Sequence, residues 1–258
     1  MSIFAPTDKP KTIEAFKKRF GNASLLAFLC KLDSETIWDK ILAAEGEVRD
    51  RLRVQLEPTQ VFNDADVTDA EITALAGKPY IRDPGHDYLP EFFRDNAWGF
   101  LVTRHKPIID VQSYRFVYVT SNSSVFEVPK SWMRLDKKYG HIRLLPINDI
   151  ALLPLNAYLL SIFGGGRTIP NFIRLKYTAG IQDIRKDYPA LYDFVLRVAA
   201  VGLIEDTFPG GSASITADGL SESQAFDIAA WLDATKGVIT NEWRIWMDKF
   251  HGVRLMVA

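Results

Sequence analysis

The chain has 258 residues, 47% of them hydrophobic and 24% charged, which is the composition of an ordinary globular protein with its own core. The formal net charge is −1, whereas a protein that wraps duplex DNA carries a clear basic excess. General nucleic-acid binding is therefore disfavoured, and only a local basic patch remains open. Cys30 is the only cysteine, which excludes an intramolecular disulfide. Its mostly apolar neighbours, residues 26–32, predict a buried structural thiol.

Neither a membrane span nor a secretion signal is recognisable in the sequence. No apolar run approaches the ~20 residues that a bilayer crossing needs. The first residues, MSIFAPTDKPK, lack the apolar core of a signal peptide. We therefore expect a soluble protein that is made in the cytoplasm and has no membrane partner.

The first third of the chain is predicted to be helical. Apolar residues at helical spacing predict a helix over Thr12–Leu29, and Asp33 is a candidate N-cap for a second helix that runs to about Arg53. Thr68–Glu71 is a capping-box pattern that opens a short third helix. The segment between these two helices, Leu56–Val67, is predicted to be a connection.

The middle of the chain is predicted to be a sheet. Four segments are rich in β-branched and aromatic residues and are separated by turn signals: Trp98–Val102, Ile108–Val119, Val125–Val128 and His141–Leu145. In the longest of them, simple alternation places Val111, Ser113 and Arg115 on one face and Tyr114 and Phe116 on the other. Short turns between the segments indicate an antiparallel sheet of about four strands.

The last hundred residues return to helix after one more strand, Phe172–Tyr177. Three helices are expected: one from Pro189 to about Phe208, one from the capping box Ser221–Gln224 to about Lys236, and one over Asn241–Phe250. Between the first two, Gly210-Gly211 is a helix-ending pair. The small residues that follow, 212–217, predict an extended arm.

This order of elements predicts an α+β fold, in which N- and C-terminal helices build a helical bundle and an antiparallel β module is inserted between them. The predicted parts are an N-terminal helical part (1–96), a β-rich insertion (97–180) and C-terminal helices (181–258) with an extended arm at 210–220. Both helical parts are expected to form one bundle.

The motifs of common enzyme chemistry are missing from the sequence. Gly164–Thr168 lacks the Gly-Lys-Ser/Thr of a phosphate loop, and no Gly-x-Ser-x-Gly elbow occurs. The four histidines show no metal-ligand spacing, and the one local group of candidates, Asp83, His86 and Asp87, lies in a proline–glycine segment predicted to be a solvated turn. We expect no catalytic residues, no cofactor and no metal site. An enzyme whose site is dispersed over the fold, such as a nuclease or hydrolase, stays open as an alternative.

The end of the chain is unusually rich in aromatic and apolar residues. Trp243, Trp246 and Phe250 recur at helical spacing, and Arg254, Leu255 and Met256 follow them. Two interpretations remain. Either this terminal helix packs on the chain's own core, or part of the segment enters a partner, since Trp, Phe, Met and Arg suit interface cores.

An ordered series of short motifs resembles a known family. The series consists of HKPIIDV (105–111), VPKSW (128–132) with Arg134-Leu135, GHIRLLP (140–146), LKYTAG (175–180) and SITADGLSES (214–223). It is similar to proteins from the structural gene clusters of tailed bacteriophages, and most of all to head–tail connectors, also called adaptor or head-completion proteins. The resemblance covers residues 40–230, and its weight lies in the shared order, since none of the motifs is a catalytic signature.

The resemblance implies a structural role in the virion neck. Such adaptors are helical bundles, some with β insertions, that assemble as a ring, typically twelve-fold, beneath the portal at one capsid vertex. The implied partners are further copies of the chain, the portal protein, a tail or tail-terminator protein, and packaged DNA in the channel. Other virion structural roles, in a tail terminator, a tail tube or the capsid surface, remain the alternative.

Three groups of residues become candidate contacts under this resemblance. The arm Ser212, Ala213, Ser214, Ile215, Thr216 and Ala217 has small side chains and suits edge-on strand addition to a neighbouring subunit. The docking candidates for the portal or another partner are Trp243, Trp246, Phe250, Arg254, Leu255 and Met256. The DNA-channel candidates are Lys130, Lys137, Lys138 and Arg143, for which an ordinary solvated surface is the alternative.

Overall fold

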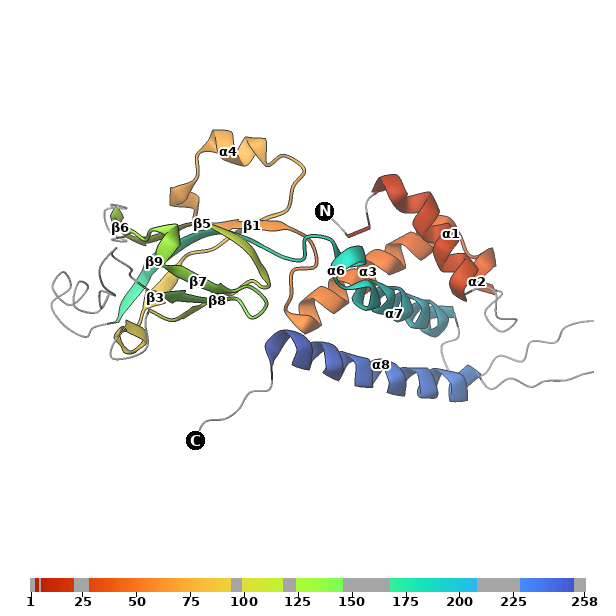
Figure 1. The fold of residues 1–258 in the computed structure, drawn as a ribbon. Helices are drawn as coiled ribbons and strands as arrows, with labels where there is room; N and C mark the ends of the chain where they lie inside the picture. Colours follow the sequence, from red (N-terminus) through yellow and green to blue (C-terminus); the bar gives the residue numbers. More distant parts are fainter. Residues whose placement is uncertain are drawn as a thin grey trace, which may run out of the picture. The chain divides into compact units, whose positions relative to one another are not determined.

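The computed structural model describes residues 3–4, 6–20, 28–93, 99–117, 124–145, 168–207 and 228–252 (Figure 1). The chain divides into two compact units, a β unit formed by Arg53–Gln182 and a helical unit formed by Ser2–Leu52 together with Asp183–Ala258. The predicted α+β class is confirmed, because helices from both ends of the chain form one unit and a mainly antiparallel β module is inserted between them.

The boundary between the two units differs from the one we expected. Residues 53–96, which the sequence placed in the N-terminal helical part, belong to the β unit. The predicted connection Leu56–Val67 contains strand β1 (Thr59–Phe62), and two more strands follow it, β2 (Tyr80–Arg82) and β3 (His86–Tyr88). Strands of three or four residues are too short to show a recognisable alternation, which is why the sequence missed them.

The second predicted helix begins where its N-cap Asp33 predicts, whereas the first begins at Lys9 rather than at Thr12 and ends at Phe20 rather than at Leu29. The bounds of the N-terminal helices are η1 (Pro6–Asp8), α1 (Lys9–Phe20), α2 (Phe28–Lys31) and α3 (Ser34–Leu52). The carboxylate of Asp33 accepts a hydrogen bond from the backbone N–H of Glu35 at 3.0 Å, which confirms the predicted N-cap of α3. One face of α3 is buried, through Ile37, Ile41 and Val48 among others.

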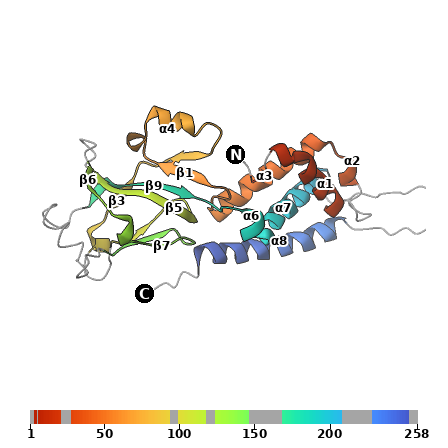
Figure 2. The same cartoon turned by 45° about the horizontal axis from the view of Figure 1, so that its top comes forward.

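The helix α7 (Pro189–Thr207) is the central element of the helical unit. A short helix, α6 (Ile184–Asp187), precedes it, and Pro189 occupies its first position as predicted. Ten of its 19 residues are buried, on every side of the helix, as is typical of a helix surrounded by others. Figures 1 and 2 show α3 and α7 side by side. Lys40 on α3 pairs with Asp206 on α7 at 2.6 Å.

The last helix, α8 (Ile228–His251), is continuous where the sequence predicted two helices. The predicted break at Lys236–Asn241 does not occur, although Gly237 lies there. Ile239 is 9% exposed and Trp243, four residues later on the same face, is 8% exposed. Burial of this face outweighs the cost of one helical glycine, which is about 1 kcal/mol.

Cys30 is exposed, so the prediction of a buried thiol was wrong. The residue lies on α2, a helix of only four residues, and its sulfur is 3.9 Å from the carbonyl oxygen of Lys17. Apolar neighbours in the sequence do not decide which side of one helical turn faces a core.

The larger sheet of the β unit has six strands, ordered β2-β1-β9-β5-β6, with β3 also paired to β9. The remaining bounds in this sheet are β5 (Ile108–Val117), β6 (Ser124–Glu127) and β9 (Ile169–Ala179). The pairs are antiparallel except β1–β2, which is parallel. The central strand β9, predicted as Phe172–Tyr177, bonds to three neighbours and therefore sets the register of the sheet.

A second sheet, β4-β8-β7, shares one apolar core with the first. Its strands are β4 (Leu101–Val102), β7 (Met133–Asp136) and β8 (His141–Leu144). The short helices of the β unit are η3 (Asp64–Asp66), α4 (Asp69–Ala74), η4 (Pro90–Phe93) and η5 (Lys130–Trp132). The described residues thus contain nine strands in two sheets, whereas we predicted a sheet of about four strands, because β7 and the three short strands before residue 89 were missed.

The register of β5 departs from simple alternation. Its pairing with β9 shifts between Val111 and Ser113, so Val111 lies in the same buried cluster as Tyr114 and Phe116. The predicted grouping of Val111 with Ser113 and Arg115 was therefore wrong. An irregularity of this kind moves every later side chain to the opposite face and leaves no clear sequence signal.

Two sequence signals in the β unit have clear physical causes. The capping box is confirmed, because the backbone N–H of Thr68 donates to Glu71 Oε2 at 2.9 Å and the backbone N–H of Glu71 donates to Thr68 Oγ1 at 3.3 Å. Gly180, the last residue of LKYTAG, has φ of +122°, and an added Cβ would lie 2.0 Å from the carbonyl oxygen of Glu57. Only glycine fits this close backbone approach.

Candidate functional site

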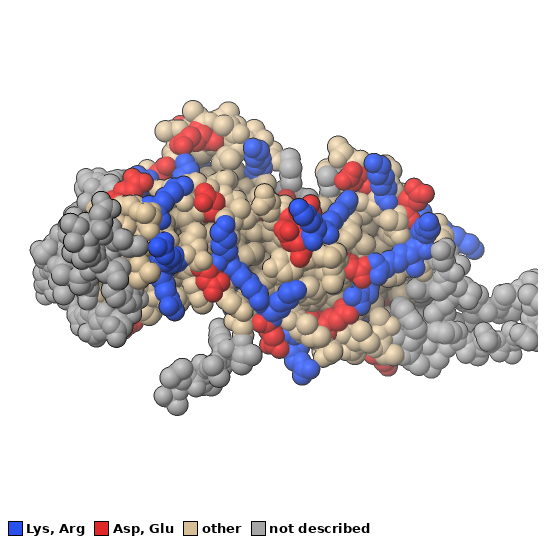
Figure 3. Space-filling model, in the orientation of Figure 1, with Lys and Arg blue, Asp and Glu red and all other residues tan. Residues whose placement is uncertain are grey.

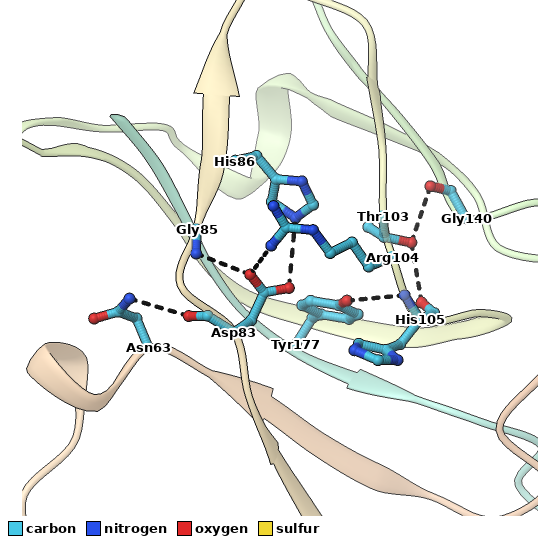
Figure 4. A network of polar contacts seen from close by, with 9 residues as sticks. All are labelled: Asn63, Asp83, Gly85, His86, Thr103, Arg104, His105, Gly140 and Tyr177. Atoms are coloured by element: carbon cyan, nitrogen blue, oxygen red, sulfur yellow. Dashed lines mark hydrogen bonds and ion pairs between the residues drawn. The ribbon is translucent and has the colours of Figure 1, made fainter. Parts of the chain in front are cut away.

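The densest group of polar side chains surrounds Asp83, in the turn between β2 and β3 (Figure 4). The sequence predicted a solvated turn here, and that prediction was wrong: Asp83 is 6% exposed and His86 is 7% exposed. The backbone explains the burial, because the N–H of Asp83 donates to the carbonyl of Phe62 at 2.9 Å and β3 pairs with the central strand β9.

The Asp83 carboxylate joins two connections of the β unit. Its Oδ1 accepts a hydrogen bond from the backbone N–H of Gly85 at 2.8 Å and pairs with the guanidinium of Arg104, which follows β4. Its Oδ2 lies 3.8 Å from Nε2 of His86, beyond hydrogen-bond distance. The carbonyl oxygen of Asp83 accepts from the side-chain amide of Asn63 at 3.0 Å.

His86 is neutral at physiological pH. Burial lowers the pKa of His86 to about 4, and the nearby Arg104 guanidinium acts in the same direction, while Asp83 opposes the shift. The pKa of His105 is lowered for the same main reason, burial. Both imidazoles are therefore held as uncharged groups next to one ion pair.

The backbone at Gly85 is required by this packing. Gly85 has φ of +106°, and an added Cβ would lie 3.1 Å from the carbonyl oxygen of Ile173 on β9. The Pro84-Gly85 pair that suggested an exposed turn instead lets the chain pass close beside the central strand.

A second set of hydrogen bonds continues the network to the end of β9. The backbone N–H of His105 donates to the hydroxyl oxygen of Tyr177 at 3.3 Å. The hydroxyl of Thr103 lies 3.0 Å from the carbonyl oxygen of His105 and 3.1 Å from that of Gly140. Burial raises the pKa of Tyr177, so its hydroxyl stays protonated.

The polar side chains around Asp83 connect separate segments of the β unit. In the part of the chain that the structure describes, no group of three or more His, Cys, Asp or Glu side chains is placed to hold a metal ion. Neither His86 nor Asp83 has a serine, threonine or cysteine side chain among its hydrogen-bond partners within the described residues. The bonds of Asp83 join the β2–β3 turn to the β4–β5 connection and to Asn63, and the bond from His105 to Tyr177 joins that connection to strand β9.

The four DNA-channel candidates all lie in the β unit. Lys130 is on η5, Lys137 and Lys138 are in the β7–β8 turn, and Arg143 is on β8. Lys130, Lys137 and Arg143 are exposed, and Lys138 is half-buried. Lys130 lies 3.9 Å from the carboxylate of Asp110, Lys138 lies over the ring of Tyr139, and Arg143 lies over the ring of Phe100.

The structure adds one basic residue that the list of candidates omitted. Arg134 on β7 is exposed and is the direct cross-strand partner of Arg143 on β8. Like charges in such pairs are destabilising unless an anion lies nearby. Recognising β7 as a strand would have revealed this pair. On the face shown in Figure 3, basic and acidic side chains are interspersed.

The three aromatic docking candidates on α8 are buried within the helical unit. Trp243 is 8% exposed, Trp246 is 7% exposed and Phe250 is fully buried. The ring of Trp243 lies 4.9 Å from that of Phe194, and the ring of Phe250 lies 5.4 Å from that of Tyr188. The sequence left two interpretations of this segment, packing on the chain's own core or entry into a partner. These three residues pack on the chain's own core.

The other predicted contacts lie outside the described residues. These are the arm Ser212–Ala217, the docking candidates Arg254, Leu255 and Met256, the capping box Ser221–Gln224 and the glycines 164–166. Among the helices in the described ranges, none combines the length and the hydropathy that a membrane crossing requires.

Comparisons with known proteins identify no family. No protein-family model matches the chain, and no curated protein sequence matches it. Among solved structures, a chain from the virion of the native gene transfer agent (GTA) particle is similar, with a TM-score of 0.36 and 14% identity over 88% of this chain and 82% of that chain. A similarity of this size decides neither fold nor function.

Proposed function

We propose that this protein is a structural component of a tailed-phage virion, which forms a homo-oligomeric ring at the portal vertex, joins the head to the tail and helps to retain packaged DNA. The main support for this proposal is that motifs of the family resemblance, although far apart in the sequence, pair with one another in the β unit. HKPIIDV leads into β5 and LKYTAG ends β9, and these two segments pair, with Ile108 opposite Ala179 and Val111 opposite Tyr177.

The other described motifs lie in the same unit. VPKSW contains η5, and GHIRLLP contains β8, which pairs with β7 so that Arg134 lies opposite Arg143. The backbone N–H of Gly180 donates to the carbonyl of Pro107 at 2.7 Å, and that of Ile108 donates to the carbonyl of Lys137 at 2.7 Å. Motifs that are distant in the sequence therefore build one local structure. This supports the view that the chain resembles the connector family because the two share this structure.

The division into units supports the same proposal. The resemblance implies a helical bundle that carries a β insertion, and the chain has a helical unit from both termini with the β unit inserted between Leu52 and Asp183. The polar network of Asp83 joins segments of that insertion. We therefore assign Asp83 and His86 a structural role rather than a catalytic one.

We assign the contacts of the ring as follows. The arm Ser212–Ala217 contacts a neighbouring subunit by strand addition, through backbone hydrogen bonds. Because Trp243, Trp246 and Phe250 are buried in the helical unit, docking on the portal falls to Arg254, Leu255 and Met256. The cross-strand pair Arg134 and Arg143, together with Lys130, Lys137 and Lys138, is the candidate DNA contact.

The test is co-expression of the full chain with the portal and tail proteins encoded beside it. We expect the chain to co-purify with the portal, and a deletion of residues 212–217 to reduce ring formation while the monomer keeps its helical circular dichroism. Replacing Arg254, Leu255 and Met256 by serine is expected to abolish portal binding, whereas Val238→Ser on the exposed side of α8, where Val238 is 55% exposed, serves as the matched control.

Two outcomes would redirect the proposal. Binding to a tail protein but not to the portal would place the chain in the tail, as a terminator or tail-tube component. A chain that stays monomeric in the presence of every neighbouring structural protein would contradict a virion ring altogether.

A further inference from the structure

The segment that connects β1 to β2, Asn63–Pro79, lies over the outer face of the six-stranded sheet, on the side opposite to β7 and β8 (Figures 1 and 2). We call it the acidic strap. It carries four acids, Asp64, Asp66, Asp69 and Glu71, and one base, Lys78. No apolar residue of the strap is buried. Its attachment to the sheet therefore depends on polar contacts rather than on a core of its own.

Four of those polar contacts are ion pairs, each between an acid of the strap and a base of the sheet. Glu71 pairs with Lys176 on β9 at 2.9 Å, and Asp64 pairs with Arg82 on β2 at 3.1 Å. Asp66 pairs with Arg115 on β5 at 2.9 Å and with Arg174 on β9 at 3.5 Å. The strap thus supplies the negative charge for a basic face of the sheet.

The centre of this face is a pair of arginines on neighbouring strands. Arg115 and Arg174 are directly opposite in register, an arrangement that is unfavourable for two like charges. The side chain of Asp66 is 4% exposed and reaches both guanidiniums, and on the other side of Arg115 its partner across the sheet is Glu127 on β6.

The strap is held to the sheet less firmly than the strands beneath it are held to one another. The pairs Asp64–Arg82 and Glu71–Lys176 are partly exposed on both sides, and pairs of this kind contribute about 0 to 1 kcal/mol each and weaken with salt. Apart from Asp66, whose side chain is 4% exposed, no residue of the strap is buried, and a segment with so few buried contacts opens at a low local unfolding free energy. The strands below it keep their apolar core when it opens, since Ile173, Leu175 and Tyr177 belong to the buried cluster.

We propose that the acidic strap is a releasable cover over a phosphate-binding face. When the strap opens, Arg82, Arg115, Arg174 and Lys176 bind the backbone phosphates of a nucleic acid, whose charges replace the carboxylates of Asp64, Asp66 and Glu71. Planar guanidiniums suit phosphate as well as carboxylate, and a nucleic-acid backbone supplies the series of anions that the strap now provides. The proposal concerns the single chain and is independent of ring assembly.

The main test compares two variants that change the net charge equally. The strap-neutral variant is Asp64→Asn, Asp66→Asn and Glu71→Gln. The control is Glu14→Gln, Asp39→Asn and Glu91→Gln, three exposed acids outside the strap. Binding of a fluorescein-labelled DNA duplex is measured by anisotropy at several salt concentrations. We expect the strap-neutral chain to bind at least about tenfold more tightly than the wild type, and the control to stay within about twofold of it.

A third variant tests whether the arginine pair is the binding group. Adding Arg115→Gln and Arg174→Gln to the strap-neutral chain is expected to return the affinity to the wild-type level and to lower the slope of log K against log salt by about 2. Equal affinities of the strap-neutral and control chains would overturn the proposal. An affinity gain that survives loss of both arginines would overturn it as well.

Hydrogen exchange of the wild-type chain provides a test that needs no substitution. At low salt, adding saturating DNA duplex is expected to speed the exchange of backbone amides in residues 64–76 and to leave the β9 amides 172–178 unchanged. Unchanged or slowed exchange in the strap on DNA binding would show that the duplex binds elsewhere and would overturn the proposal.

Discussion

The helical unit and the β unit are stabilised in different ways. The helical unit is built on α7, whose ten buried residues are all apolar, and its ion pairs, such as that of Lys40 with Asp206, lie at the surface. The β unit also has an apolar core, but it buries Asp83, Arg174 and the imidazole of His86, whereas the described part of the helical unit buries one carboxylate, that of Glu45, which accepts from the backbone N–H of Ile3.

The two units therefore differ in the kind of interaction that selects their structure. Apolar burial is not directional, so the helical unit depends on shape and volume. Buried polar groups need particular partners, so the irregular segments of the β unit are fixed by directed bonds, above all at Asp83. Loss of an aromatic side chain should damage the first unit most, and loss of a hydrogen-bonded carboxylate the second.

The largest effect is expected for Phe250→Ala in the helical unit. Phe250 is fully buried between Tyr188 and Trp246, and removal of a buried phenyl group costs about 3 to 5 kcal/mol. The measurement is the loss of hydrogen-exchange protection in α7. The matched control is Ile245→Ala on the same helix, where the side chain is 53% exposed, with an expected change within about 0.5 kcal/mol. Equal effects of the two substitutions would contradict the packing of α8 described above.

A smaller but substantial effect is expected for Asp83→Ala in the β unit. The change leaves the buried N–H of Gly85 without its acceptor and removes the partner of Arg104, for a loss of about 2 to 3 kcal/mol. Exchange of the β9 amides is the measurement. Asp136→Ala, at an exposed position on β7, should change it little. A neutral result for Asp83→Ala would show that the network does not stabilise the unit.

The pH dependence of stability should also be concentrated in the β unit. The pKa of His86 is about 4 in the folded chain and 6.5 when unperturbed, so between these values the unfolded chain binds more protons. Stability is therefore full above pH 6.5 and falls as the pH is lowered towards 4, by up to about 1.4 kcal/mol per pH unit from this group. His105, whose pKa is also lowered, contributes with the same sign.

The check is urea denaturation of the wild type and of His86→Gln across this range of pH. The variant is expected to show a shallower fall in stability between pH 6.5 and 4, because one of the titrating groups is gone. Parallel curves would show that His86 is not held neutral by burial.

The smallest effect is expected for Thr68→Ala in the acidic strap. The substitution removes one half of the capping box, which costs about 1 kcal/mol. Exchange of the amides in α4 should therefore speed about fivefold, while β9 stays protected. Thr73→Ala, in the same helix but away from the cap, is the control.

What the sequence predicts well is local chemistry. The cap at Asp33, the capping box at Thr68 and the helix start at Pro189 each depend on a few neighbouring residues, and all three are confirmed. The α+β class follows from the order of helical and β-rich segments. The short strands and the irregular register of β5 depend on pairing with β9, which no local pattern contains.

The burial of polar groups in the β unit could not be predicted from local sequence either. Asp83 and His86 stand in a segment with proline and glycine, and only the passage of that segment beside β9 makes them buried. Asp66 and Arg174 are 108 positions apart in the numbering, so their pairing follows from tertiary structure alone. The continuity of α8 likewise depends on burial of Ile239 and Trp243 against the helical unit.

The proposed function is tested most directly by the mass and shape of the complex with the cognate portal. Native mass spectrometry and electron microscopy of the full chain mixed with assembled portal would provide both. We expect a closed ring of this chain bound at one end of the portal, and the loss of that ring when residues 212–217 are deleted. A chain that remains monomeric beside an intact portal would contradict the proposed function.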